Sequence, residues 1–266
     1  MRADVYITQQ HPEISRTRAQ RLIEAGLVSI DGQVVSRCGM DVCADEPHAV
    51  VLGVDNPYVG RGGCKLEAAL TAFELPITDA WAIDVGASTG GFTDCLLQHG
   101  ATRVYAVDSG WGQLAQKLLD DTRVCSMERC NARYLSASDF DAAFEQHGGA
   151  DVIVMDVSFI SQTYILPVLP SLLRADGHIV TLIKPQFEVG KSQIGKHGLV
   201  KRADARREAV QRVLDAAAAA QLCAVGLIRS PIVGGDGNVE FLAHFRHTAE
   251  GKASNLLAQR SLSWFA

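Results

Sequence analysis

Four charged residues lie in apolar surroundings, where a charged side chain is costly unless it has a partner or a chemical role. Asp156 ends the apolar run VIVMD, and Lys184 ends the apolar run IVTLIK. An apolar strand has no structural need for a terminal lysine. Lys65 begins an expected helix, and Glu240 lies in the middle of the strand pattern NVEFLAHF, where a buried glutamate needs a partner. These four charged residues are therefore candidates for a functional site.

A glycine-rich bend joins an apolar strand to an apolar helical pattern. Its residues are Gly86, Ala87, Ser88, Thr89, Gly90 and Gly91. Such a bend brings backbone N–H groups and a helix N-terminus close to a ligand. Asp84 precedes the bend. Asp108 ends the next strand, where an acid can accept both hydroxyls of a ribose.

The spacing of the glycines favours one class of ligand. The bend has the pattern GxxxGG and lacks the second glycine of the GxGxxG pattern that binds pyrophosphate. We therefore expect a nucleoside without phosphates, such as S-adenosylmethionine (SAM). The bend alone leaves NAD, and with it an oxidoreductase, as an alternative.

Alternating strands and helices position these residues. The expected strands are WAIDVG, RVYAVD, DVIVMDVS, HIVTLIKP, AVGLIRSP and NVEFLAHF, and the expected helices are 65–74, 91–99, 112–119, 160–174 and 203–221. This alternation predicts a doubly wound α/β fold with a mostly parallel sheet covered on both faces. The stretch SPIVGGDGNVEF sets the last two strands close together, which predicts an antiparallel last strand. Because strand carboxyl ends meet at one edge, Asp156 and Lys184 should lie together beside the ligand crevice.

The first 55 residues carry a different pattern. Ser15 is a candidate N-cap, and Ala19, Leu22 and Ile23 follow at helical spacing up to Gly26. The stretch LVSIDGQVV then predicts a hairpin with its turn at Asp31 and Gly32. We expect a small α+β domain over 1–55, a linker over 56–64, a larger domain over 65–247 and a polar tail over 248–266 that adds little.

Composition excludes several classes of protein. The chain has 266 residues and a net charge of −5, and no apolar run reaches the roughly 18 residues that span a bilayer. Its first residues lack the apolar core of a signal peptide. Seven cysteines without a CxxC pattern predict packing roles, a reducing compartment and no metal site. We expect a cytoplasmic protein with no membrane partner, and the sequence makes no prediction of oligomeric state.

Basic residues gather in one segment despite the negative total. Residues 184–212 hold eight Lys or Arg against three acids. A solvated helix face explains many such runs, and a surface that contacts phosphates is the alternative. Because the segment follows the strand that ends in Lys184, we expect it at the rim of the crevice.

The N-terminal pattern resembles the S-four-type RNA-binding motif. The resemblance rests on the Ser15-Arg16 pair, Ala19, the Leu22-Ile23 pair, Gly26 and the Asp31-Gly32 turn. It implies that arginines of the helix contact RNA. Residues 1–55 hold more acids than arginines, so only one face of this domain can be basic.

The whole chain, up to about His247, resembles the TlyA family of ribosomal RNA 2′-O-methyltransferases. These proteins are also labelled haemolysin A and are related to FtsJ-type methyltransferases. The motifs YVGRGGCKLEAAL, DVGASTGGFTDCLL, AVDSGWGQL, DVSFIS, LIKPQFEVG and GNVEFL occur in the family's order. Gly60 and Cys64 depart from the Ser and Leu expected in the linker.

The resemblance implies a Rossmann-like SAM-dependent methyltransferase fold with an N-terminal RNA-binding domain. It implies the catalytic residues Lys65, Asp156, Lys184 and Glu240, and the SAM-binding residues Asp84, Gly86, Ala87, Ser88, Thr89, Gly90, Gly91, Asp108 and Asn131. For RNA binding we expect Arg16, Arg18, Arg21, Arg61, Lys191, Lys196, Lys201 and Arg202. The implied substrate is cytidine ribose in ribosomal RNA of the large subunit, with the small subunit left open. The implied partner is ribosomal RNA or a ribosomal subunit.

The resemblance also implies a mechanism. A ribose 2′-OH is a poor nucleophile until its proton is removed. We expect Lys184, neutral at the moment of reaction, to accept that proton, with Lys65 as a neighbouring ammonium that favours the neutral form. Asp156 and Glu240 would fix the positions of both lysines.

Other enzyme classes lack their signatures. A cytosine C5 methyltransferase needs a cysteine nucleophile near the strand ends, and VMDVSF and LIKPQF contain none. An amino methyltransferase shows (D/N)PP(Y/F) where DVSF stands, and the Arg-Leu-Asp stretch of pseudouridine synthases is absent. A non-catalytic RNA-binding or ribosome-assembly factor stays as an alternative, although it leaves the four charged residues unexplained.

Overall fold

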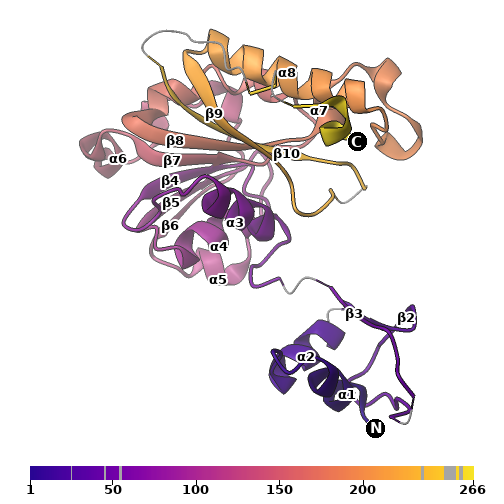
Figure 1. Cartoon of the computed structure of the whole chain (residues 1–266). Helices are drawn as coiled ribbons and strands as arrows, with labels where there is room; N and C mark the ends of the chain where they lie inside the picture. The colour runs from indigo at the N-terminus through magenta and orange to yellow at the C-terminus, as the bar shows by residue number, and fades with distance from the viewer. Residues whose placement is uncertain (25, 45, 54–55, 235–236, 249–255, 258–259) are drawn as a thin grey trace. The chain divides into compact units, whose positions relative to one another are not determined.

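The computed structural model describes residues 1–24, 26–44, 46–53, 56–234, 237–248, 256–257 and 260–266 (Figure 1). The chain divides into two compact units, Met1–Pro57 and Tyr58–Ala266. The predicted linker ended at residue 64, whereas helix α3 (Gly62–Ala72) already begins inside it.

The first unit packs two helices on a small antiparallel sheet. Its helices are α1 (Ala3–Gln10) and α2 (Arg16–Glu24), and its strands run in the order β2 (Gln33–Val34), β1 (Val28–Ile30) and β3 (Val50–Leu52). The predicted cap is confirmed, because Ser15 Oγ accepts a hydrogen bond from the N–H of Arg18 at 3.3 Å. The predicted turn is confirmed too, since Asp31 and Gly32 both have positive φ, as the hairpin requires. Helix α1 and strand β3 were not predicted.

The second unit is built on a seven-stranded sheet. Its strands are β4 (Trp81–Val85), β5 (Arg103–Val107), β6 (Val124–Met127), β7 (Ala150–Met155), β8 (Leu173–Ile183), β9 (Leu222–Arg229) and β10 (Phe241–His247). They lie in the order β6-β5-β4-β7-β8-β10-β9. Strands β4 to β8 are parallel, and β10 runs antiparallel to both β8 and β9. The predicted mostly parallel sheet with an antiparallel last strand is confirmed, and only the short strand β6 was missed.

Helices cover both faces of this sheet (Figure 1). Helices α3, α4 (Gly91–Gln98) and α5 (Gln116–Leu119) lie on one face, and α8 (Ala203–Ala219) lies on the other. Two short helices, α6 (Ala142–His147) and α7 (Pro185–Glu188), complete the unit. Alternate residues of β4 enter different cores: Ile83 packs in the same cluster as Val213 of α8, whereas Ala82 packs with Leu96 of α4. The apolar run of β4 is thus explained by burial on both sides.

The predicted helix over 160–174 is wrong. The segment forms two short 3₁₀ turns, Gln162–Tyr164 and Leu169–Leu172, and β8 begins at Leu173. Pro167 and Pro170 cause the difference, because a proline has no N–H to donate and its ring clashes with the preceding turn of a helix. The predicted helix over 112–119 shortens to α5.

The tail after residue 247 is not merely polar. Phe265 is completely buried against Phe241 of β10, and Leu257 is also buried. Arg206 of α8 donates a hydrogen bond to the carbonyl oxygen of Phe265 at 2.8 Å. The tail therefore contributes to the core beside α8, because burial of its large apolar side chains is favourable.

Candidate active site

Two of the expected catalytic residues meet at the carboxyl ends of neighbouring parallel strands. Asp156 follows β7 directly and Lys184 follows β8 directly. The Nζ atom of Lys184 lies 2.6 Å from Oδ1 of Asp156 and donates a hydrogen bond to Oγ of Ser158 at 2.8 Å. Strand pairing alone brings these side chains together, as the alternation of strands and helices predicted.

The other two expected catalytic residues form a buried ion pair. Lys65 lies on the first turn of α3, and its ammonium group is paired with the carboxylate of Glu240. Glu240 precedes β10 rather than lying within it, which corrects the sequence prediction. Burial raises the pKa of Glu240, the positive charges of Lys65 and then Lys184 oppose that shift, and Asp156 adds to it. Glu240 is therefore close enough to feel the charges of the other three residues.

The glycine bend lies beside this cluster and borders two cavities. Gly86 has φ +86°, and a Cβ atom there would approach the carbonyl oxygen of Asp156 to 2.6 Å. Only glycine fits such a position. A cavity of about 620 Å³ opens on one side of the bend, and a smaller one of about 180 Å³ reaches Lys184. Both are lined by Gly86, Ser88, Asp156 and Ser158, so the larger cavity leads to the charged cluster.

Asp108 forms part of the wall of the larger cavity. Its two carboxylate oxygens accept backbone N–H groups from Ser88 at 2.8 Å and from Gly110 at 2.7 Å. These bonds hold the carboxylate still while each oxygen keeps a further lone pair. Asn131 also lines this cavity, and its side-chain oxygen accepts from the N–H of Arg133 at 3.1 Å.

Asp84 and Gly90 were expected to bind the cofactor, but neither of them lines either of these two cavities. Asp84 is fully buried and accepts a hydrogen bond from Oγ1 of Thr93 at 2.6 Å. It thus ties the end of β4 to the first turn of α4, across the bend. Burial, reinforced by the charge of Asp156, raises the pKa of Asp84 to about 7, while the bond from Thr93 opposes the shift.

The raised pKa of Asp84 predicts a pH-dependent stability. The folded protein holds this proton more tightly than the unfolded chain, so the stabilisation is complete below about pH 4 and is lost as the pH rises through about 7. As the pH rises from 5 to 8, we expect the unfolding free energy of the wild type to fall by about 2–3 kcal/mol because of Asp84. Urea unfolding of wild type and Asp84→Asn at both pH values measures this difference. The exposed substitution Asp215→Asn should leave this fall in unfolding free energy as large as in wild type. A fall of the wild-type size in Asp84→Asn would contradict the assignment of the raised pKa to Asp84.

The expected RNA-binding residues are divided between the two units. In the first unit, Arg16 donates a hydrogen bond to the buried carboxylate of Asp4 at 3.0 Å, so its positive charge is partly neutralised within the domain. Arg18 is exposed, and the side chain of Arg21 lies outside the described residues. The other expected residues belong to the second unit: Arg61 lines the small cavity, and Lys191, Lys196, Lys201 and Arg202 are exposed, with Arg202 paired to Asp204.

Several residues of the site were not predicted from the sequence, among them Ser158 and Phe159. Ser158 contacts Lys184, and Phe159 is 92% exposed and lines the larger cavity. Both belong to the motif DVSF, so their position directly after Asp156 was the available signal.

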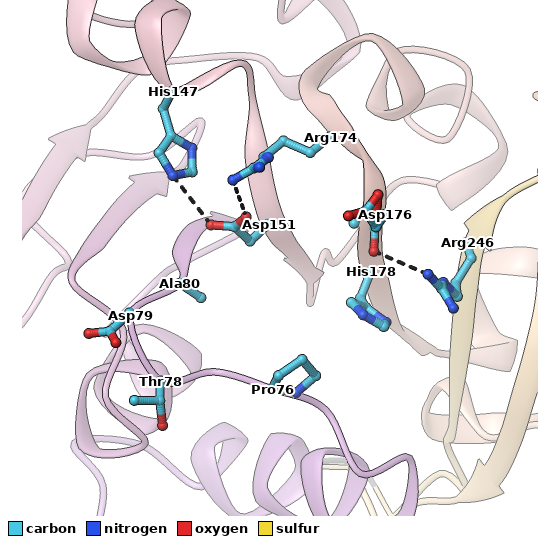
Figure 2. Close-up of a pocket in the computed structure, with 11 residues that line it drawn as sticks. Pro76, Thr78, Asp79, Ala80, His147, Asp151, Arg174, Asp176, His178 and Arg246 are labelled. Atoms are coloured by element: carbon cyan, nitrogen blue, oxygen red, sulfur yellow. Dashed lines mark hydrogen bonds and ion pairs between the residues drawn. The ribbon is translucent and has the colours of Figure 1, made fainter.

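A further cavity, of about 410 Å³, lies at the opposite edge of the sheet (Figure 2). It is lined near the amino ends of β7 and β8 by Asp151 and Arg174, which are joined by an ion pair of 2.8 Å, and by His147 and His178. None of the expected site residues lines this cavity.

The family that matches the second unit makes it a methyltransferase built on the doubly wound α/β fold. Two solved structures share the fold, each with a TM-score of 0.50 over 71% of this chain. One is described as a "putative S-adenosylmethionine dependent methyltransferase from Listeria monocytogenes" and is 12% identical, and the other is an S-adenosylmethionine dependent methyltransferase from Mesorhizobium loti and is 14% identical. The chain belongs to the FtsJ-like methyltransferase family, which matches residues 58–247, and an S4 domain matches residues 1–46.

Several relatives match almost the full chain. The 16S/23S rRNA (cytidine-2′-O)-methyltransferase TlyA of Mycobacterium tuberculosis is 40% identical over 92% of this chain and 89% of its own length. Hemolysin A of Brachyspira hyodysenteriae is 40% identical over 92% of this chain and 99% of its own length. A solved structure described as "Putative hemolysin from Streptococcus thermophilus" is 41% identical, with a TM-score of 0.75 over 100% of this chain and 94% of the other. The helices of the described residues include none with both the length and the apolar character of a membrane span.

Proposed function

We propose that this protein transfers a methyl group from SAM to the 2′-oxygen of cytidine in ribosomal RNA. The observation that carries the proposal is the cluster of Lys184, Asp156, Lys65 and Glu240 at the end of a nucleoside-sized cavity. The family match and the activity named for the mycobacterial relative support the same reaction.

The larger cavity suits the proposed cofactor. Its volume of about 620 Å³ is within the range of small-molecule sites. Asp108 offers two fixed oxygens that can accept the hydroxyls of a ribose, and Gly86 leaves room for close approach to the bend. We propose that these residues, with Ser88 and Asn131, hold SAM, which supplies an electrophilic methyl group when bound.

The residues around Lys184 suit the removal of a proton from a ribose hydroxyl. Asp156 and Ser158 fix the Nζ atom of Lys184 within hydrogen-bond distance of both. In its neutral form this amine accepts the 2′-OH proton as the oxygen attacks, and Asp156 then stabilises the ammonium group that results. The Lys65–Glu240 pair forms the buried side of the cluster. Glu240 holds the ammonium group of Lys65 there as a second positive charge, beside that of Lys184. Much of the rate enhancement follows from holding the hydroxyl in line with its target.

The proposed substrate is a large polyanion, and positive side chains suit its phosphates. Lys191, Lys196 and Lys201 are exposed in the segment that follows Lys184 and α7. Contacts of this kind set the position of an RNA without reading its sequence. The S4 domain adds a second RNA-binding unit, and we propose a ribosomal subunit or its RNA as the partner.

A methyl-transfer assay tests the proposal. Labelled SAM is incubated with the purified chain and with large and small ribosomal subunits that lack the modification, and the labelled nucleotide is then mapped by nuclease digestion. We expect label in 2′-O-methylcytidine. A protein that binds SAM but labels neither subunit would point to another acceptor, and one that binds no SAM would leave RNA binding as its role.

A further inference from the structure

Two segments that leave neighbouring strands are fastened to each other next to the active site. The segment 157–162 follows Asp156 and β7, and helix α7 follows Lys184 and β8. Glu188, the last residue of α7, is 2% exposed. Its Oε2 atom accepts a hydrogen bond from Oγ of Ser161 at 2.6 Å, and its Oε1 atom accepts the backbone N–H of Gln162 at 2.9 Å.

The segment 157–162 needs such an anchor. Phe159 has φ +64°, a conformation that a residue with a side chain adopts only when its surroundings enforce it. Phe159 is 92% exposed, and its ring meets the ring of Phe187 at a centroid distance of 5.2 Å. Beyond Phe159, the side chain of Gln162 donates to the carbonyl oxygen of Leu182 in β8 at 2.5 Å. The fastening therefore lies at the far end of the segment, at Ser161 and Gln162.

The same segment provides two parts of the site. Ser158 accepts the hydrogen bond from Nζ of Lys184, and Val157, Ser158, Phe159 and Ile160 line the larger cavity. A shift of the segment would therefore move a partner of Lys184 and a wall of the cofactor cavity at the same time.

We propose that Glu188 is a positioning residue, which holds the segment 157–162 so that Ser158 meets Lys184 and the wall of the cofactor cavity stays formed. The inference rests on the proposed methyl transfer. Glu188 itself touches neither cavity.

The chemistry of the contact calls for two acceptors at one place. A carboxylate supplies both, one oxygen for the hydroxyl of Ser161 and the other for the N–H of Gln162. A glutamine at position 188 keeps one oxygen, which can still accept the N–H of Gln162. Its NH₂ group can donate to Oγ of Ser161, and the hydroxyl of Ser161 can then donate to Oγ1 of Thr163, 2.8 Å away. Glu188→Gln should therefore preserve most of the anchor, and Glu188→Ala should remove it.

The first experiment compares Glu188→Ala, Glu188→Gln and the exposed control Glu145→Ala. Single-turnover methyl transfer gives the rate of the chemical step, and calorimetry gives the affinity for SAM. We expect Glu188→Ala to slow methyl transfer by about ten- to a hundredfold, because a displacement of the order of 1 Å has effects of this size. Its affinity for SAM should fall by a smaller factor. Glu188→Gln should recover the rate to within about threefold of wild type, and Glu145→Ala should match wild type.

A double-mutant cycle with Ser158→Ala tests the route from Glu188 to Lys184. If Glu188 acts through Ser158, the two substitutions are not additive, and Glu188→Ala slows the Ser158→Ala enzyme much less than it slows wild type. If Glu188→Ala does not fold, Ser161→Ala replaces it, since this substitution removes one of the two bonds without emptying the site of Glu188.

Two results would overturn the inference. One is a folded Glu188→Ala protein with the wild-type rate and affinity for SAM, and the other is additive effects of Glu188→Ala and Ser158→Ala. If wild type transfers no methyl group to ribosomal RNA, the proposed function fails. The affinity for SAM then decides the inference alone: weakened binding in Glu188→Ala with recovery in Glu188→Gln supports it, and unchanged binding contradicts it.

Discussion

Because Lys184 is the proposed base, we expect Lys184→Ala to lower the rate of methyl transfer by about a hundred- to ten-thousandfold and to leave the affinity for SAM within about threefold of wild type. A positioned general base contributes about 10²–10⁴ in rate, and alanine also removes the partner of Asp156. The larger cavity keeps the walls that we propose for SAM, because Lys184 lines only the smaller one. Single-turnover transfer and calorimetry with the purified protein measure the two quantities.

Lys184→Arg separates a base from a positive charge. Arginine keeps the charge and can pair with Asp156, but it stays protonated and cannot accept the proton. We expect this variant to be as inactive as Lys184→Ala. Substantial activity in Lys184→Arg would show that charge alone is needed. Arg174→Ala, at the opposite edge of the sheet, is the matched control and should transfer methyl groups like wild type.

Lys65→Met has the second large effect, and it falls on stability as well as on activity. The substitution leaves the carboxylate of Glu240 buried without its ammonium partner. Removing one member of a buried ion pair costs about 3–5 kcal/mol of unfolding free energy. We expect this loss in urea unfolding at pH 7.5, together with loss of methyl transfer.

The double variant Lys65→Met/Glu240→Leu tells stability and catalysis apart. Replacing both charges by apolar groups of similar size removes the unpaired charge, so most of the stability should return. Activity should not return, because the charges beside Lys184 are gone. Breaking the exposed Arg202–Asp204 pair by Asp204→Asn should leave the unfolding midpoint where it is. A stable, fully active double variant would contradict the role of the pair.

Much of the fold followed from local patterns. Apolar runs that alternate with helical patterns predicted six of the strands, because a strand that is buried on both faces is a continuous run of apolar residues. Ser15, Gly26 and the turn at Asp31 were predicted because caps and turns depend on a few adjacent residues. The helix over 160–174 failed for an equally local reason, since its two prolines outweigh the apolar spacing.

The sequence by itself determined which residues stand at the strand ends, and therefore that Asp156 and Lys184 lie at one edge. Only the tertiary structure decided the pairings. Lys65 and Glu240 are 175 positions apart in the chain, and no periodicity connects them. Asp84 carries the same type of side chain as Asp108, yet packing buries it behind the bend while Asp108 borders the cavity. The physical reason is that the spacing of apolar residues along a segment indicates which side of the segment is buried. The partner of a buried charge depends instead on which distant segments pack against it.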